Sequence, residues 1–393
     1  MIPELRRAFN ASWNEQRYAN FLTTLERRVG VSIDFPISET ACFFPQRLIS
    51  ELAETGEELV RQAMAGEAGQ AAARVVPPRF RGTRIGAVPT FAQVDFGLTR
   101  AADGTLVPKL VELQAFPSLY GFQIALADAY RSAFELSGDL SPYLSGLDVE
   151  SYHALLGETI VGGADPAEVV LMEIEPDRQK TRPDFVMTEQ LWGVKAIDTA
   201  AVIQEGRRLF YRRNGRQTPI RRIYNRVIPD ELERKQIALP FDYRDDLDVE
   251  WLGHPEWYFR ISKFSIPWLR HPSVPQTWFL HETTSLPLPR ERLLLKPLFS
   301  FAGGGIVFAP TDEQLAAIPE DRRHDFILQE RIAFEPVIET PHGPTQAEIR
   351  MMYVWTDRLR PVLPLVRMGR GKMMGVDHNK GLRWVGASAG FVQ

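Results

Sequence analysis

Residues 87–116 read AVPTFAQVDFGLTRAADGTLVPKLVELQAF, and this stretch decides the fold. Two β-rich runs flank the pair Asp103-Gly104, which is typical of the tight turn in a β-hairpin. Side chains alternate between the faces of a strand, so Glu112 and Gln114 leave the second strand on the same side, while Asp95 lies on the first strand. Two carboxylates and one amide oxygen from paired strands form a set of hard oxygen ligands that suits Mg²⁺. The alternative is a polar, solvent-exposed face of the hairpin.

The composition is that of a globular protein with more than one domain. The chain has 393 residues, of which 44% are hydrophobic and 24% are charged, and its formal net charge is −4. At roughly 150 residues per domain, this length indicates two or three domains. The nearly balanced charge provides no strong attraction to nucleic acid, so we expect no nucleic-acid partner. The single cysteine, Cys42, excludes an internal disulfide and any metal site built from several cysteines.

Nothing in the sequence indicates a membrane protein. No apolar run approaches the roughly 18 residues that span a bilayer. Residues 1–10, MIPELRRAFN, lack the apolar core of a signal peptide. We therefore expect a cytoplasmic protein with no membrane partner, and the sequence carries no signal for an oligomeric state.

The pattern of the sequence changes along the chain and predicts four segments. Residues 1–86 carry apolar stripes at helical spacing and are expected to form helices. Residues 87–150 contain the hairpin and a following helix. Residues 151–255 alternate short apolar runs with helical stretches, which predicts a parallel sheet. Residues 256–393 alternate again and carry most of the remaining polar motifs.

Individual elements follow from the same patterns. One helix is expected over Arg47–Arg74, ended by Pro77 and Pro78, and another over Arg182–Trp192. The expected strands of the third segment are Val169–Ile174, Val194–Ile197, Leu209–Tyr211 and Ile220–Ile223.

A glycine-rich loop lies between two apolar runs in residues 293–308, LLLKPLFSFAGGGIVF. Successive glycines, here Gly303, Gly304 and Gly305, allow backbone N–H groups to turn toward a phosphate. Lys296 lies at the end of the first run and can supply a compact positive charge to the same phosphate. The alternative is a flexible hairpin loop with an unrelated lysine.

Further polar residues follow apolar runs in the last third of the chain. One run ends in Gln329-Glu330-Arg331-Ile332, and another begins with Glu348-Ile349-Arg350. Taken singly, each cation is more typical of a solvated surface. The order along the chain is nevertheless specific, with Lys263 before these motifs and Arg367 and Asn379 after them.

Together these residues resemble the ATP-grasp superfamily. Lys263 with Val274-Pro275-Gln276-Thr277, followed by Lys296 with its glycine loop, is similar to the first motifs of the ribosomal-protein glutamate ligase branch. The last motif of that branch, Val-Asp followed by Glu-x-Asn, is similar to Val94-Asp95 and Glu112-Leu113-Gln114 near the N-terminus. The resemblance is therefore to a circularly permuted ATP-grasp protein, as in eukaryotic glutathione synthetase and glutathionylspermidine synthetase. It predicts that the hairpin and the C-terminal strands form one sheet.

The resemblance implies a fold class and a reaction. The fold is α/β (α+β), a circularly permuted ATP-grasp fold with a preceding Rossmann-like α/β domain and N-terminal helices. The reaction is that of an ATP- and Mg²⁺-dependent ligase, which phosphorylates a carboxylate and lets an amine or a thiol displace phosphate from the acyl phosphate. The protein contributes mainly by positioning the reactants and neutralising charge.

The same resemblance implies a role for each residue. The metal ligands are Asp95, Glu112 and Gln114. The nucleotide-binding residues are Lys263, Lys296, Gly303, Gly304, Gly305, Gln329, Glu330, Ile332 and Glu335. The catalytic residues, which clamp the transferring phosphoryl group and the acceptor, are Arg350, Arg367 and Asn379.

Three positions depart from the family pattern. Gln114 stands where the family has Asn, and Glu348 stands where the related branch has Asp. Ala302 replaces the Glu that binds metal in the glutathione-type permuted enzymes. The last departure weakens an assignment to those two enzymes in particular.

The substrates are small-molecule or peptide carboxylates and amines on this hypothesis. Arg222, Asn225 and Arg226 lie at the end of an expected strand of the middle segment. Ligands tend to bind at the carboxyl ends of parallel strands, so these residues are candidates for an acidic or peptide-like substrate. The alternative is a basic strand end on the protein surface.

Two other functions remain open from the sequence. The departures at Gln114 and Ala302 favour a nucleotide-binding protein without ligase turnover. An ATP-grasp phosphotransferase would need a phosphate-carrying histidine, for which His378 beside Asn379 is the candidate.

Overall fold

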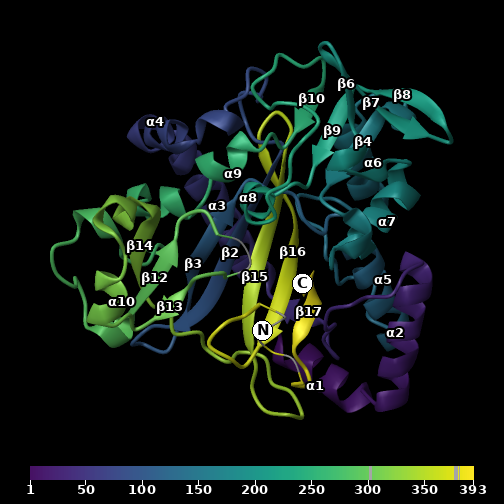
Figure 1. Cartoon of the computed structure of the whole chain (residues 1–393). Helices are drawn as coiled ribbons and strands as arrows, with labels where there is room; N and C mark the ends of the chain where they lie inside the picture. Colours follow the sequence, from purple (N-terminus) through teal and green to yellow (C-terminus); the bar gives the residue numbers. More distant parts are fainter. Residues whose placement is uncertain (301–302, 376–378, 380) are drawn as a thin grey trace.

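The computed structural model describes residues 1–300, 303–375, 379 and 381–393 (Figure 1). Its largest element is a six-stranded sheet, with the order β1 (Cys42–Phe44), β17 (Gly386–Val392), β16 (Leu359–Gly369), β15 (Gln346–Trp355), β2 (Phe91–Arg100) and β3 (Leu106–Gln114). The strands β2 and β15 pair antiparallel, although about 250 residues separate them in the sequence. The prediction that the hairpin and the C-terminal strands share one sheet is confirmed.

The β2–β3 hairpin turns where the sequence predicts. Gly104 has a φ of 86°, a left-handed conformation that glycine adopts without steric cost. In the resulting register, Asp95 lies opposite Glu112 and Gln93 lies opposite Gln114, with a shift in register directly after Asp95. The hairpin therefore brings polar residues of both strands to the same part of the sheet.

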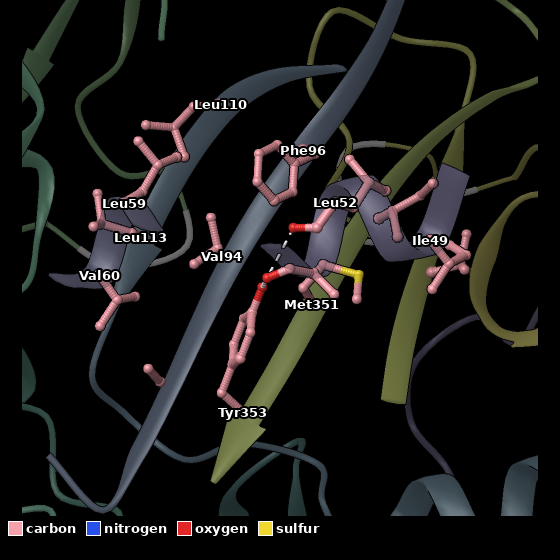
Figure 2. Close-up of a cluster of buried hydrophobic side chains, with 14 of the residues drawn as sticks. Ile49, Leu52, Leu59, Val60, Val94, Phe96, Leu110, Leu113, Met351 and Tyr353 are labelled. Atoms are coloured by element: carbon pink, nitrogen blue, oxygen red, sulfur yellow. Dashed lines mark hydrogen bonds between the residues drawn. The ribbon is translucent and has the colours of Figure 1, made fainter. Parts of the chain in front are cut away.

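One face of the central sheet is apolar and packs on α3 (Gln46–Met64), as Figure 2 shows. The Tyr353 hydroxyl donates a hydrogen bond to the Ala53 carbonyl at 2.9 Å and joins the sheet to this helix. Because side chains alternate along a strand, the residues between these apolar ones face the other side of the sheet. The buried side chains of this cluster include Val94, Phe96, Leu113, Ile349 and Met351.

The N-terminal segment is helical, with one correction. The helices are α1 (Pro3–Ser12), α2 (Glu15–Val29), α3 and α4 (Gly66–Val75), and α5 (Phe122–Phe134) follows the hairpin. The prediction of one helix over Arg47–Arg74 is wrong, because Ala65 is extended (φ −94°, ψ 157°) and separates α3 from α4. Gly66, the first residue of α4, has a φ of 52°, a left-handed conformation that glycine adopts without steric cost, so the break between the two helices falls at Ala65 and Gly66.

A four-stranded parallel sheet forms the middle of the chain, as predicted. Its order is β10 (Glu250–Leu252), β9 (Arg222–Asn225), β4 (Val169–Glu173) and β5 (Lys195–Asp198). The helices of this region are α6 (Val149–Val161), α7 (Arg182–Trp192) and α8 (Pro229–Arg234). In Figure 1 this sheet lies above and to the right of the central sheet, together with α6 and α7.

The expected parallel strand at Leu209–Tyr211 belongs instead to a separate antiparallel sheet. The strand expected over Ile220–Ile223 is divided, because Ile220 ends the last strand of that sheet and Arg222 begins β9. That sheet consists of β6 (Ile203–Glu205), β7 (Arg208–Arg213) and β8 (Arg216–Ile220). Asn214 and Gly215 connect β7 and β8 with φ values of 50° and 78°. An Asn-Gly pair is a strong hairpin signal, so the sequence contained the information for this ribbon.

Another antiparallel sheet, of four strands and called the small sheet below, lies on the other side of the central sheet, at the left of Figure 1. Its order is β11 (Thr277–Phe279), β14 (Phe326–Glu330), β12 (Leu293–Pro297) and β13 (Val307–Phe308), and α10 (Asp312–Ala316) follows β13. The helix α9 (Glu256–Arg260) and the 3₁₀ helix η5 (Lys263–Trp268) precede this sheet. The Lys296 ammonium lies 3.4 Å from the Val111 carbonyl of β3, so the small sheet meets the edge of the central sheet.

The remaining 3₁₀ helices are η1 (Pro78–Phe80), η2 (Pro166–Glu168), η3 (Pro176–Arg178), η4 (Thr199–Ala201), η6 (Leu280–Glu282), η7 (Arg290–Arg292) and η8 (Glu320–Asp325). Among the helices of the described residues, none combines the length and the apolar character needed to cross a bilayer.

Candidate active site

The polar face of the central sheet centres on Asp95, a residue that is 1% exposed. Arg350, directly opposite on β15, binds both oxygens of this carboxylate at 2.6 Å. Arg367 on β16 also donates to Asp95 and pairs with Glu348. Two arginines and two carboxylates from three adjacent strands thus form one buried network.

This network sets the charges at the site. Burial alone would raise the pKa of Asp95, but Arg350 and Arg367 outweigh burial and hold it below its usual value. Burial raises the pKa of Glu348 to about 7, against the attraction of Arg367. Glu348 is therefore the carboxylate of this network that is closest to accepting a proton at neutral pH.

The predicted metal ligands differ in how free their oxygens are. Both Asp95 oxygens are bound by guanidinium groups, so Asp95 acts here as an anchor for Arg350 and Arg367. The Glu112 side chain is 32% exposed and lies 3.8 Å from Arg350. No group of three or more His, Cys, Asp or Glu residues in the described part of the chain is arranged to hold a metal ion.

Mg²⁺ is nevertheless compatible with the two donors that remain accessible, Glu112 and Gln114. This ion commonly binds through one or two protein groups and completes its shell with waters and substrate phosphates. The structure thus fits a metal shared with a phosphate ligand better than a site made by the protein alone.

Two buried lysines, Lys296 on β12 and Lys263 at the start of the 3₁₀ helix η5, interact electrostatically with Glu112. The Lys296 ammonium donates a hydrogen bond to Gln329 Oε1 at 2.6 Å, and that of Lys263 donates to the Ser300 carbonyl at 2.7 Å. Burial lowers the pKa of Lys296 to about 8 and also lowers that of Lys263. In both cases the negative charge of Glu112 is the largest influence that opposes the lowering, so these three residues share one electrostatic environment.

The glycine loop lies against the loop that follows β16. Gly303 and Gly305 have φ values of 74° and 72°, a conformation that favours glycine. A β-carbon on Gly303 would collide with the Met373 side chain. The two loops therefore pack closely. Ala302 and His378 lie outside the described residues.

Asn379 is buried within its own loop and does not reach the network. Its amide oxygen accepts hydrogen bonds from the Arg370 and Gly371 N–H groups at 3.0 and 3.3 Å. Its amide nitrogen donates to the carbonyls of Met373 and Gly375 at 3.0 and 3.2 Å. Since both ends of the amide are engaged, Asn379 shapes this loop.

The segment after β14 contains the other nucleotide candidates. The Gln329 side chain binds Lys296 and donates to the Thr277 hydroxyl at 3.1 Å. Glu330 forms an ion pair with Arg292. Ile332 is half-buried in the irregular segment that follows. The Glu335 carboxylate lies 2.9 Å from Arg100, so it is already paired.

The three substrate candidates of the middle sheet separate into two groups. Arg222 donates to the carbonyls of Thr159 and Ile160 at the end of α6 and pairs with Glu250, so it does not point toward the network. Asn225 and Arg226 are both buried at the carboxyl end of β9.

Arg226 connects the middle sheet to the loop that follows β3. It donates to the Pro117 carbonyl, and its guanidinium lies 4.7 Å from the centre of the Phe116 ring. Its Nε atom is buried and has no hydrogen-bond partner among the residues that the structure describes. Glu173, at the end of the neighbouring strand, has a pKa that burial raises to about 8, although Arg226 opposes the shift. This buried donor lies at the carboxyl end of a parallel strand, which is where ligands tend to bind in open α/β sheets.

Sequence reasoning did not identify Gln93, which is fully buried on the same face as Asp95. Its amide oxygen accepts hydrogen bonds from Arg350 at 2.9 Å and from Gln114 at 2.7 Å. Its position two residues before Asp95 on one strand was the available signal, because residues at i and i+2 share a face.

The comparisons with known proteins bear on the fold. A solved structure with a similar fold is that of a glutathione synthetase-like effector from Globodera pallida in its apo form. The superposition covers 96% of each chain with a TM-score of 0.59 and 12% sequence identity. The two chains share a mixed α/β fold. At this identity the likeness carries no activity from one chain to the other. The sequence matches no protein-family model and no curated protein.

Proposed function

We propose that this protein is an ATP-dependent ligase of the ATP-grasp type, which joins a carboxylate to an amine or a thiol through an acyl phosphate. The observation that carries the proposal is the position of Lys263 and Lys296. Both are buried, and both face Glu112 beside the arginine–carboxylate network of the central sheet. Burying two cations this deeply costs free energy, which a bound polyphosphate would offset. The fold shared with a glutathione synthetase-like protein agrees with this function.

We further propose that the ATP-grasp core is circularly permuted. The segments with the Val-Asp and Glu-x-Gln motifs are β2 and β3, and β2 pairs directly with β15. In an unpermuted relative the corresponding motifs end the chain. The observed pairing is the one that such a rearrangement would leave intact.

In this reaction, ATP supplies the phosphoryl group that activates the carboxylate. The nucleotide residues act by position and charge: Lys263 and Lys296 would contact its phosphates, and the glycine loop would cover them and exclude water. Gln329, Glu330 and Ile332 would border the adenine. Glu335 is the least supported member of the set, because its carboxylate would have to leave Arg100 to bind a ribose.

Mg²⁺ would be held by Glu112 and Gln114 together with the phosphates. Asp95 would act indirectly, because it holds Arg350 and Arg367 at the same face of the sheet. The two guanidinium groups would then stabilise the negative charge that develops on the transferring phosphoryl group. Asn379 would contribute through the shape of its loop.

The acceptor substrate would bind near Asn225 and Arg226. The Nε atom of Arg226, which has no partner in the described part of the chain, could donate to a carboxylate, and Arg226 also contacts the loop that follows Gln114. A carboxylate held there would approach the metal site along that loop. This geometry favours an acidic small molecule or a peptide end.

Two measurements test the proposal. Isothermal titration calorimetry should detect ATP binding that strengthens with Mg²⁺. ADP release should then require a carboxylate and an amine, which a screen of pooled amino acids, peptides and polyamines would identify. ATP binding without release in any pool would favour a nucleotide-binding protein without turnover, and a stable phosphoenzyme would favour a phosphotransferase. Absence of ATP binding would contradict the proposal.

The lowered pKa of Lys296 predicts how ATP affinity depends on pH. With a pKa of about 8, this ammonium is charged at pH 7 and mostly neutral at pH 9. Since the neutral amine attracts no phosphate, ATP affinity should fall about tenfold between these values, which follows from a one-site titration. Lys296→Arg stays charged and should remove most of this dependence, whereas Lys195→Arg, at an exposed lysine, should leave it unchanged. An unchanged slope in Lys296→Arg would contradict the assignment.

A further inference from the structure

Gln93 lies at the junction of three parts of the candidate site. It is fully buried on β2, directly opposite Gln114 and two residues before Asp95. Its amide contacts Arg350, Gln114 and the Ser118 carbonyl of the loop after β3. A buried glutamine with all of these contacts satisfied is a fixed element of the site.

The orientation of both glutamine amides follows from Arg350. A guanidinium only donates hydrogen bonds, so the Gln93 atom 2.9 Å from Arg350 Nη1 must be its oxygen. The same oxygen lies 2.7 Å from the Gln114 amide, and that contact must therefore be the Gln114 nitrogen. The bidentate pair with Asp95 holds Arg350 in turn. The chain of contacts leaves no freedom to exchange the nitrogen and oxygen of Gln114.

This arrangement leaves the Gln114 oxygen available. Gln114 is half-buried, and within the described part of the chain its oxygen has no hydrogen-bond partner. Gln93 completes its own set of contacts by donating to the Ser118 carbonyl at 3.0 Å. One residue thus sets the direction of the Gln114 oxygen and secures the loop next to it.

We propose that Gln93 is a positioning residue that presents the Gln114 oxygen to the divalent cation of the bound nucleotide. The inference rests on the proposed function. Glutamine has one more rotatable bond than asparagine, so an unrestrained Gln114 would lose more conformational freedom on binding a metal. The hydrogen bond from Gln114 to Gln93 removes that freedom in advance. Partners that orient a metal ligand in this way typically contribute tenfold to hundredfold in metal affinity.

The test measures Mn²⁺ affinity by the electron paramagnetic resonance signal of the free ion, in the presence of the ATP analogue with a β,γ-imido bridge. Gln93→Met keeps the approximate volume and removes the hydrogen bonds, so Mn²⁺ affinity should fall about tenfold or more. Affinity for the analogue without metal should stay within about twofold of the wild-type value. The matched control is Gln123→Met at another buried glutamine, which should leave Mn²⁺ affinity unchanged.

A second variant separates positioning from folding. In Gln93→Glu the carboxylate still accepts from Arg350 and Gln114 but no longer donates to Ser118, so Mn²⁺ affinity should stay within about threefold of the wild-type value. Loss of affinity in both variants, with intact folding by circular dichroism, would overturn the positioning role. If Gln93→Met does not fold, Gln93→Asn takes its place, because its amide is one carbon too short to reach Arg350 and Gln114 together and should likewise lower Mn²⁺ affinity; unchanged affinity in this variant would overturn the inference.

A double variant tests whether Gln93 acts through Gln114. Gln114→Leu should lose Mn²⁺ affinity, and Gln93→Met added to it should cause no further loss, because the two residues form one unit. Additive losses would show that Gln93 acts independently of Gln114 and would overturn the inference. Failure of the wild-type protein to bind the analogue at all would instead count against the proposed function, so the two failures are distinguishable.

Discussion

Replacing Asp95 with Asn is expected to lower the free energy of unfolding by about 3–5 kcal/mol, the typical effect of removing one partner from a buried ion pair. Asp95 is almost completely buried and is bound by both Arg350 and Arg367. Asparagine can still accept one hydrogen bond but carries no charge. Arg367 keeps Glu348, whereas Arg350 keeps its hydrogen bond to Gln93 and has Glu112, at 3.8 Å, as its remaining charged partner. Urea unfolding of both proteins at pH 7 measures the difference.

The control is Asp312→Asn, because Asp312 pairs with Arg290 on the surface and is 81% exposed. Exposed pairs contribute about 0–1 kcal/mol, so this variant should remain close to the wild-type protein. The folded-state pKa of Asp95 is lowered, so its contribution exists above the unfolded pKa of roughly 3.9 and disappears as the pH falls through the folded value. The stability gap should therefore close in acid. A variant of normal stability that lost only Mn²⁺ affinity would favour Asp95 as a direct metal ligand.

Local signals in the sequence predict much of the fold. The Asp103-Gly104 turn determined the hairpin, and the helix over Arg182–Trp192 has the predicted bounds. The parallel sheet of the middle segment also follows from short apolar runs between helices. Two predictions failed where a single backbone conformation decided the outcome. The single helix predicted over Arg47–Arg74 is interrupted by the extended residue Ala65. The parallel strand predicted at Leu209–Tyr211 instead pairs in a β7–β8 hairpin, whose turn is the left-handed pair Asn214-Gly215.

The candidate site was harder to predict, because its contacts depend on pairing between distant strands. Alternation places Glu112 and Gln114 on one face of their strand. It cannot show that Arg350 lies opposite Asp95, because these two residues are about 250 positions apart in the sequence. Asp95 was predicted to bind metal, and the sequence could not show that its carboxylate oxygens bind Arg350 and Arg367. The catalytic role of Asn379 and the substrate role of Arg222 stay predictions, and in this structure nearby backbone groups bind both side chains.

The two variants that test the chemistry should have opposite signatures. Lys296→Ala removes a buried cation from the candidate phosphate site and should weaken ATP binding about tenfold to hundredfold even without an acceptor. This loss corresponds to a charged hydrogen bond of about 1.5–3 kcal/mol. Glu112→Gln keeps the size of the side chain and removes the charge that would anchor Mg²⁺, so turnover should collapse while ATP binding weakens less. The matched controls are Lys195→Ala and Glu51→Gln, two substitutions at exposed positions, which should change neither ATP binding nor turnover.

Glu112→Gln should also change the titration of Lys296. The charge of Glu112 is the largest influence that raises the Lys296 pKa against burial, so its removal should lower that pKa further below 8. The ammonium would then lose its proton at a lower pH, and the fall in ATP affinity should begin closer to neutral pH than in the wild-type protein. Calorimetric titrations with ATP from pH 6 to pH 9 measure this shift. An unchanged pH profile together with unchanged Mg²⁺-dependent ADP release in Glu112→Gln would show that Glu112 and Lys296 do not share a site. The proposed ligase centre would then be wrong even though the fold is shared.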